Sequence, residues 1–143
     1  MMQFQDYDNR DKYPHFVIEG TLPSLNEYLA AIGKSPYKGG RMKSDCMERV
    51  GWSIRSQLKG FKTTCLLTVH FVYYEPSMKR DKDNVHAMSS KVILDSLQAC
   101  NVIPNDGWNN IYNSTHDYFI DKVHPRIEVY LEEMKEDDKF KNG

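Results

Sequence analysis

A short charged segment, Lys79–Asn84, is the first place in the sequence where residue types and spacing could support chemistry. It contains Asp81 and Asp83, and two aspartates spaced by two residues in extended backbone point the same way, so both carboxylates can converge on one cation. Magnesium takes a few carboxylate oxygens and leaves its remaining positions to water and substrate phosphate. A third carboxylate would complete such a site, and Asp106 is the best-placed candidate. The segment therefore predicts a magnesium site that acts on a phosphate.

Basic residues accompany these acids, and they leave two interpretations open. Lys79, Arg80 and Lys82 could hold a phosphate close to the aspartates, helped by the positive end of the helix that we expect after Asp83. The alternative is a charged turn in which Asp83 caps that helix, because Asp-x-Asp is common in turns. The pattern alone is compatible with both.

The net charge of the chain is −1, but the charge is unevenly distributed. From Lys34 to Lys91 there are 12 lysines and arginines against five acids, whereas Glu132–Gly143 carries five acids and three bases. A basic middle that holds a few acids is compatible with a nuclease, and also with an ordinary solvated surface.

The stretch Gly33–Lys43 carries part of this basic charge. It has three glycines, one proline and four basic residues, Lys34, Lys38, Arg41 and Lys43. This composition predicts a mobile loop rather than a regular element. Such a loop could grip the DNA backbone, and its alternative is a solvated loop without a ligand.

The elements that must position these residues follow from hydrophobic periodicity and turn signals. We expect strands over residues 15–20, 63–75, 111–120 and 126–134, a brief helix over 27–32, and longer helices from Ser44 or Asp45 to Lys59 and from Asn84 to Cys100. The order β-α-β-α-β-β predicts an α+β fold, with two main helices packed on a single mixed sheet of about four strands. Residues 1–13 and 135–143 are expected to be frayed.

Length and composition exclude several classes of protein. At 143 residues the chain fits one domain. Its longest mostly apolar run, Cys65–Tyr74, is too short to span a bilayer, and residues 1–16 lack the pattern of a signal peptide, so we expect a cytoplasmic protein without a membrane segment. Three widely spaced cysteines argue against a disulfide framework or a zinc ribbon. The five histidines lack short ligand spacing and are expected to be structural or exposed, with His86, near Asp83, the one to watch.

The order of motifs along the chain resembles that of RusA-type Holliday junction resolvases. Arg80–Asn84 resembles the family's Asp-x-Asp-Asn, Lys91–Leu97 its helix with Lys and Asp-x-Leu, and Asn101–Asp106 its short loop that ends in acids. Leu22–Asn26 resembles its N-terminal Pro-Ser-x-Asn element. The resemblance spans roughly residues 16–129, and several residue types match in order, which makes it more specific than a lone Asp-x-Asp.

The resemblance implies roles for individual residues. The metal-binding aspartates would be Asp81, Asp83 and Asp106, and the catalytic lysine would be Lys91. Two features depart from the family pattern. Asp83 and Lys91 are about one helical turn farther apart than in the best-known bacterial members, which keeps Lys91 on the same helix face. Asn105 stands where the family has an additional aspartate.

The implied function is a magnesium-dependent endonuclease, with Mn²⁺ as a substitute, that cuts four-way DNA junctions as a homodimer. Two active sites related by a twofold axis would nick opposing strands symmetrically. Two alternatives stay open. One is a catalytically silent nucleic-acid-binding protein, and the other is a metal-dependent hydrolase that acts on flapped or other branched DNA, or on a different phosphodiester.

Overall fold

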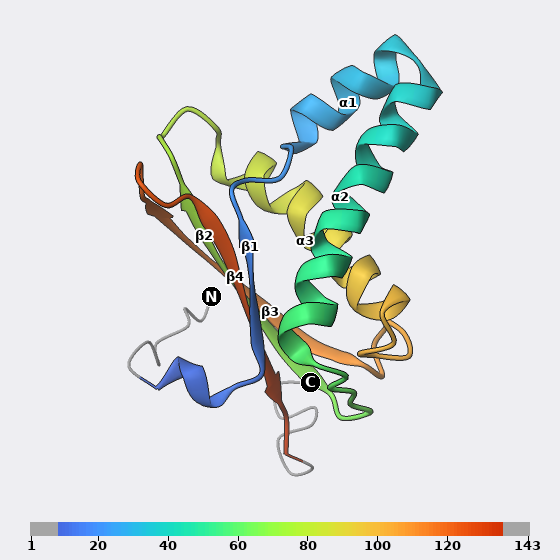
Figure 1. The fold of residues 1–143 in the computed structure, drawn as a ribbon, viewed down its shortest axis with the longest axis vertical. Helices are drawn as coiled ribbons and strands as arrows, with labels where there is room; N and C mark the ends of the chain where they lie inside the picture. The colour runs from blue at the N-terminus through green and yellow to red at the C-terminus, as the bar shows by residue number, and fades with distance from the viewer. Residues whose placement is uncertain (1–8, 136–143) are drawn as a thin grey trace.

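The structure, a computed structural model, describes residues 9–135, and within them three helices lie on one side of a four-stranded sheet (Figure 1). The strands are β1 (His15–Glu19), β2 (Leu67–Glu75), β3 (Ile111–Ile120) and β4 (Arg126–Glu133). The helices are α1 (Leu25–Lys34), α2 (Pro36–Leu58) and α3 (Lys82–Ala99), and a short 3-10 helix, η1 (Arg10–Lys12), precedes β1. The predicted α+β class is confirmed, with α2 and α3 as the two main helices.

The strand order is β1-β4-β2-β3. β2 is antiparallel to β4 and parallel to β3, and α3 lies in the connection between the two parallel strands. Because parallel neighbours end at the same edge of a sheet, the end of β3 lies beside the end of β2, from which the chain turns into α3. This topology brings Glu75, Asp81 and Ile120 to one pocket, although 45 positions separate the first from the last.

The hydrophobic core lies between the helices and one face of the sheet. Every second residue of β2 is fully buried against the helices, namely Leu67, Val69, Phe71 and Tyr73. The helices α2 and α3 fill the opposite side with residues at helical spacing: Val50, Ile54, Leu58, Val85, Met88, Val92 and Leu97. Fully burying one such side chain stabilises a fold by roughly 1.5–3 kcal/mol. The core therefore fixes the orientation of α3, which carries most of the predicted site.

The prediction of a mobile basic loop over Gly33–Lys43 is wrong. α1 continues to Lys34, and α2 begins at Pro36 after the single residue Ser35. Proline is favourable at the first position of a helix, where its missing N–H has no helical partner to lose. The Ser35 hydroxyl accepts a hydrogen bond from the backbone N–H of Lys38 (3.1 Å). Ser35 and Pro36 thus begin a helix, although the glycine and proline content of this segment is typical of a loop.

Gly39 explains why this glycine-rich stretch is compact. It is buried where α2 leaves α1, and a Cβ added there would lie 2.4 Å from Ile32 Cγ1 and 3.3 Å from Ile32 Cα. Glycine therefore permits close contact between the two helices. A Cβ added at Gly40, the next residue of α2, would have no atom within 4 Å, so Gly40 makes no close packing contact.

Other boundaries shift by a few residues. The strand predicted from Thr63 begins at Leu67, because the Thr63 N–H instead donates to the carbonyl of Val102 (2.9 Å). Cys65, which lies within the predicted strand, precedes β2 and is exposed. The predicted strand Ile111–Ile120 is confirmed at both ends.

The predicted frayed tails lie largely outside the described residues, which begin at residue 9 and end at residue 135. Within the described part, Arg10–Lys12 form η1, and Tyr13 packs against Val72 and Tyr130 on the sheet face opposite the helices. Residues 10–13 therefore form a short helical turn that leads onto the sheet. No helix in this part of the chain combines the length and the apolar character needed to cross a membrane.

Candidate active site

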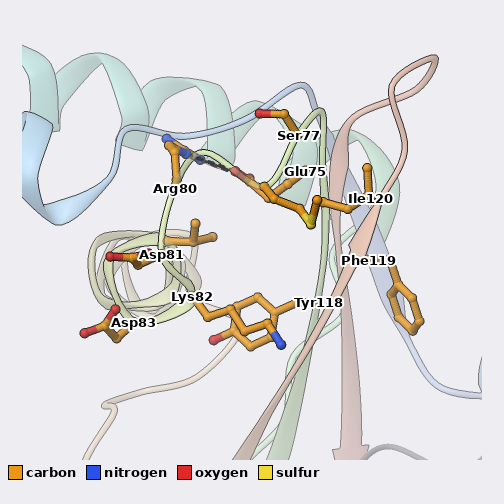
Figure 2. Close-up of a pocket in the computed structure, with 11 residues that line it drawn as sticks. Glu75, Ser77, Arg80, Asp81, Lys82, Asp83, Tyr118, Phe119 and Ile120 are labelled. Carbon is orange, nitrogen blue, oxygen red and sulfur yellow. Dashed lines mark hydrogen bonds and ion pairs between the residues drawn. The ribbon is translucent and has the colours of Figure 1, made fainter.

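The candidate site is built on the first turn of α3. Asp81 is the N-cap residue, in extended backbone (φ −68°, ψ 145°), and Asp83 is the second helical residue rather than the cap that the sequence indicated. Both side chains are exposed, and neither forms an ion pair with a residue between 9 and 135. Figure 2 shows that they project from the same side of the turn, away from Ile120. Two carboxylates without a protein cation thus lie at the positive end of a helix dipole.

Arg80 holds this turn in place. Its Nε and Nη2 donate to the two carboxylate oxygens of Glu75 (2.9 and 3.0 Å) (Figure 2). Its Nη1 donates to Glu27 Oε1 (2.9 Å) and to the carbonyl of Leu22 (2.8 Å). Burial lowers the pKa of Arg80, but hydrogen bonds to Glu75 and Glu27 outweigh this effect, and the pKa is raised. Arg80 was predicted to contact DNA, and the structure uses its guanidinium to join the ends of β2 and α3 to α1.

Lys91 lies on the same face of α3 as Asp83, because residues 83, 87, 91 and 95 are spaced by four along one continuous helix. A separation of eight residues corresponds to about 12 Å along the axis. Lys91 Nζ donates to Asp95 Oδ1 (3.1 Å), and Lys43 of α2 binds Asp95 Oδ2 (3.3 Å). The hydrogen bond and charge of Asp95 raise the pKa of Lys91, and the charge of Asp106 adds a smaller effect in the same direction. Lys91 therefore remains cationic, with 63 % of its side chain exposed.

Asp106 is partly buried in the loop between α3 and β3, and its charge makes a small contribution to the raised pKa of Lys91. Asn105 closes a local turn there, since its side-chain oxygen accepts the Asp106 N–H (2.7 Å). Within residues 9–135, no three carboxylate, imidazole or thiol groups are placed to hold one metal ion together. Asp81 and Asp83 thus lie two residues apart at the start of α3, and Asp106 lies in the loop that follows the helix. Two aspartates on one turn fit an ion such as Mg²⁺, which keeps several waters and takes one or two carboxylates from the protein.

A row of polar aromatic side chains lies next to Asp83, and the sequence did not predict it as a unit. His86 Nδ1 pairs with the Tyr118 hydroxyl (2.8 Å), and the His86 ring stacks on His116 with centroids 4.5 Å apart. His116 Nδ1 in turn pairs with the Tyr73 hydroxyl (3.1 Å). The available signal was the alternation of His116 and Tyr118 in one strand, together with His86 one helical turn after Asp83.

Burial changes the ionisation of this row. Desolvation, followed by the charge of His86, lowers the pKa of His116 to about 4, and desolvation also lowers the pKa of His86. Desolvation and the negative charge of Asp83 raise the pKa of Tyr118 to about 12. Both imidazoles and the phenol are therefore neutral at pH 7, so the row supplies hydrogen bonds beside the acidic turn rather than charge.

A pocket of about 750 Å³ opens between the first turn of α3 and the end of β3 (Figure 2). Its lining combines the Arg80–Glu75 pair and Lys82 with the aromatic ring of Tyr118 and the apolar side chain of Ile120. The pocket therefore adjoins the two exposed aspartates and offers space for a group attached to a bound phosphate.

The basic residues predicted to bind DNA lie where α1 meets α2, beside Asp95 of α3 and next to the acidic turn. Around the start of α2, a depression of about 400 Å³ is lined by Tyr37, Lys38 and Arg41. Arg49 also lines it, but its guanidinium donates to the carbonyls of Glu19 (2.9 Å) and Thr21 (3.2 Å). Arg41 is 65 % exposed and lies 3.4 Å from Asp45. Lys34 is the last residue of α1, and Lys43 of α2 forms an ion pair with Asp95. Lys79 and Lys82 lie close to Asp81 in sequence. DNA contact by all of these residues stays a prediction.

Comparison with known proteins found no match for this chain, either among protein-family models or among curated proteins. The function of the chain has to be argued from the geometry of the acidic turn, the cations around it and the adjoining pocket.

Proposed function

We propose that this protein is a magnesium-dependent endonuclease that cuts branched DNA, with the four-way junction as its substrate. The observation that carries the proposal is the pair of exposed carboxylates, Asp81 and Asp83, which have no ion-pair partner in the described part of the chain although Lys79 and Lys82 are their neighbours in sequence. Carboxylates repel phosphate unless a metal ion intervenes. An acidic turn inside a basic surface is the arrangement that metal-assisted phosphodiester hydrolysis requires.

Each residue of the candidate site has a separate role in the proposed reaction. Asp81 and Asp83 would hold Mg²⁺, or Mn²⁺ in its place, and the bound ion would orient a water molecule and stabilise charge on the phosphate. Lys91, on the same helix face, would stabilise negative charge on the phosphate or on the leaving oxygen. In the reaction one water adds to phosphorus, one P–O bond breaks, and the leaving oxygen takes a proton. Asp106 is the third carboxylate of the proposal, and it would contribute to the same site from the loop after α3.

The basic surface supports DNA as the substrate. Lys34, Lys38 and Arg41 lie at the α1–α2 corner, where they can contact backbone phosphates some distance from the cleaved bond. A homodimer would place two such sites around one junction, which suits a substrate of near twofold symmetry. The same proposal places the protein in the cytoplasm, together with its DNA.

One assay separates the proposal from its alternatives. The purified protein would be incubated with Mg²⁺ and a synthetic four-way junction, a matched duplex or a flap. Paired symmetric nicks in the junction, lost on chelation and restored by Mg²⁺ or Mn²⁺, are the expected result. Binding without cleavage of any substrate would favour a silent DNA-binding protein, and preferred cutting of the flap would favour a different structure-specific nuclease.

A further inference from the structure

The pocket beside the acidic turn has a charged rim and an apolar wall. The first turn of α3 forms the rim, and Met78, Val85 and Ile120 contribute to the wall. Met78 is 87 % exposed and Ile120 is 49 % exposed, so this wall faces solvent in the free protein. Exposed apolar side chains grouped beside polar residues are typical of a binding surface.

The guanidinium at the back of the pocket is already bound by carboxylates. Arg80 and Glu75 line the pocket and share two hydrogen bonds (Figure 2), and Glu27 binds the same guanidinium. The pocket is therefore unsuited to a second phosphate and is suited to an uncharged group.

The ring of Tyr118 adds an aromatic surface that is already held in position. Its hydroxyl is bound by His86 Nδ1 (2.8 Å), and its ring stacks on Tyr73 with centroids 5.1 Å apart. The ammonium of Lys82 lies 5.5 Å from the centre of the same ring. A ring fixed on two sides loses little freedom when a ligand packs against it. Lys82 lies on the acidic turn, between Asp81 and Asp83, and its side chain lines the pocket.

We propose that this pocket receives one unstacked nucleobase of the strand whose phosphate is bound at Asp81 and Asp83. The inference rests on the proposed function and names the part of the substrate recognised beside the cleaved bond. A nucleotide joins a flat, uncharged base to an anionic phosphate, which matches an apolar and aromatic pocket bordered by Lys82. Every base has a π face that packs on aromatic side chains, and proteins that act at branched or single-stranded sites take bases out of the stack.

The test combines a change in the protein with a change in the DNA. A four-way junction would carry one abasic nucleotide, placed in turn at each position next to the cleaved phosphate. KM and kcat would be measured for the wild-type protein, the double variant Met78→Ala/Ile120→Ala, and the control Val123→Ala. Val123 is 95 % exposed and does not line the pocket. Both altered wall residues are exposed, so unchanged thermal unfolding is expected and would be checked.

We expect the abasic nucleotide to raise KM for the wild-type protein roughly five- to tenfold at one position. The double variant should show a similar rise on the intact junction, and the abasic nucleotide should then add nothing. Val123→Ala should behave like the wild type. If the two effects multiply instead, the base does not occupy the pocket and the subsite is wrong, while cleavage of the intact junction still supports the nuclease.

Two other outcomes also decide the matter. If the wild-type protein neither binds nor cuts the intact junction, the proposed function fails, and the subsite fails with it. If the double variant dissociates from dimer to monomer in sedimentation while its response to the abasic nucleotide stays that of the wild type, the wall is a contact between two copies of the chain and the base subsite is overturned.

Discussion

Arg80 and Glu75 form a two-point ion pair, in which Nε and Nη2 of the guanidinium lie 2.9 and 3.0 Å from the two carboxylate oxygens. The exposed fractions of the two side chains are 23 % and 8 %. The pair connects the last residue of β2 to the residue before the N-cap of α3, so it sets where the acidic turn begins. Removing one partner of a largely buried pair leaves the other charge poorly compensated, which costs more than the loss of an exposed pair.

Glu75→Gln should therefore lower the free energy of unfolding by about 2–3 kcal/mol, since Arg80 would keep Glu27 as its remaining carboxylate partner. Urea unfolding measures this change. The matched control is Asp45→Asn, which removes the partner of Arg41 where the two side chains are 65 % and 63 % exposed, and it should cost less than about 0.5 kcal/mol. Equal effects of the two substitutions would show that the Arg80 pair does not hold the turn.

Gly39→Ala should destabilise the protein by about 1–3 kcal/mol, because the new methyl group would overlap Ile32 and push α1 away from α2. Gly40→Ala is the control. It adds a methyl group in open space within the same helix and should stabilise the protein by about 0.5–1 kcal/mol. Thermal unfolding of the two variants should shift in opposite directions, and a shift in the same direction would contradict the close helix contact.

Asp83→Asn should reduce junction cleavage by roughly two orders of magnitude or more, because it removes a charged ligand from the proposed metal site. Binding of the junction should be retained, since the same substitution removes a negative charge that repels phosphate. Single-turnover cleavage and gel-shift titration measure the two effects separately. Asp45→Asn, which removes an exposed aspartate from α2, should cut normally, and normal cutting by Asp83→Asn would show that the metal-site assignment is wrong.

Lys38→Ala and Arg41→Ala should each weaken DNA binding without changing the rate of cleavage of bound junction. Each removed phosphate contact should also reduce the slope of log affinity against log salt by about one. Binding titrations over a range of salt concentrations test this. Lys62→Ala, on the exposed turn after α2, is the control and should leave the slope unchanged.

The pKa of His116, lowered by burial from 6.5 to about 4, predicts a pH-dependent stability. Between pH 4 and 6.5 the His116 imidazole is largely protonated in the unfolded chain and largely neutral in the folded chain. The free energy of unfolding therefore rises with pH from about 4 to 6.5 and is constant above that range. Since part of the imidazole is solvated, the contribution should not exceed about 2 kcal/mol.

His116→Asn keeps an acceptor near the Tyr73 hydroxyl but has no group that titrates in this range. Urea unfolding at several pH values should therefore show a flatter profile for this variant than for the wild type between pH 4 and 6.5. His124→Asn, at an imidazole whose side chain is 53 % exposed, is the control. An unchanged profile for His116→Asn would show that His116 does not cause the pH dependence.

Local patterns in the sequence determined much of the fold. The alternation in β2 and β3 and the apolar spacing in α2 and α3 predicted the core faces, because side-chain period follows backbone geometry directly. The same reasoning placed Asp81 and Asp83 at the start of a helix. It failed over Gly33–Lys43, where composition suggested a loop. Gly39 takes part in a helix–helix contact, and a contact with Ile32 cannot be inferred from the composition of the segment.

Tertiary structure alone decided which distant residues meet. Arg80 reads as a DNA-binding cation in the sequence, yet Glu75, Glu27 and Leu22 bind its guanidinium. Asp106 reads as a third metal ligand, and this role stays a prediction, since the loop after α3 carries it on a different element from Asp81 and Asp83. The sequence by itself determined the acidic pair, because two neighbours on one turn stay together in any fold that forms the helix. Partners and pockets depend on how strands and helices pack, and that was decided by the whole chain.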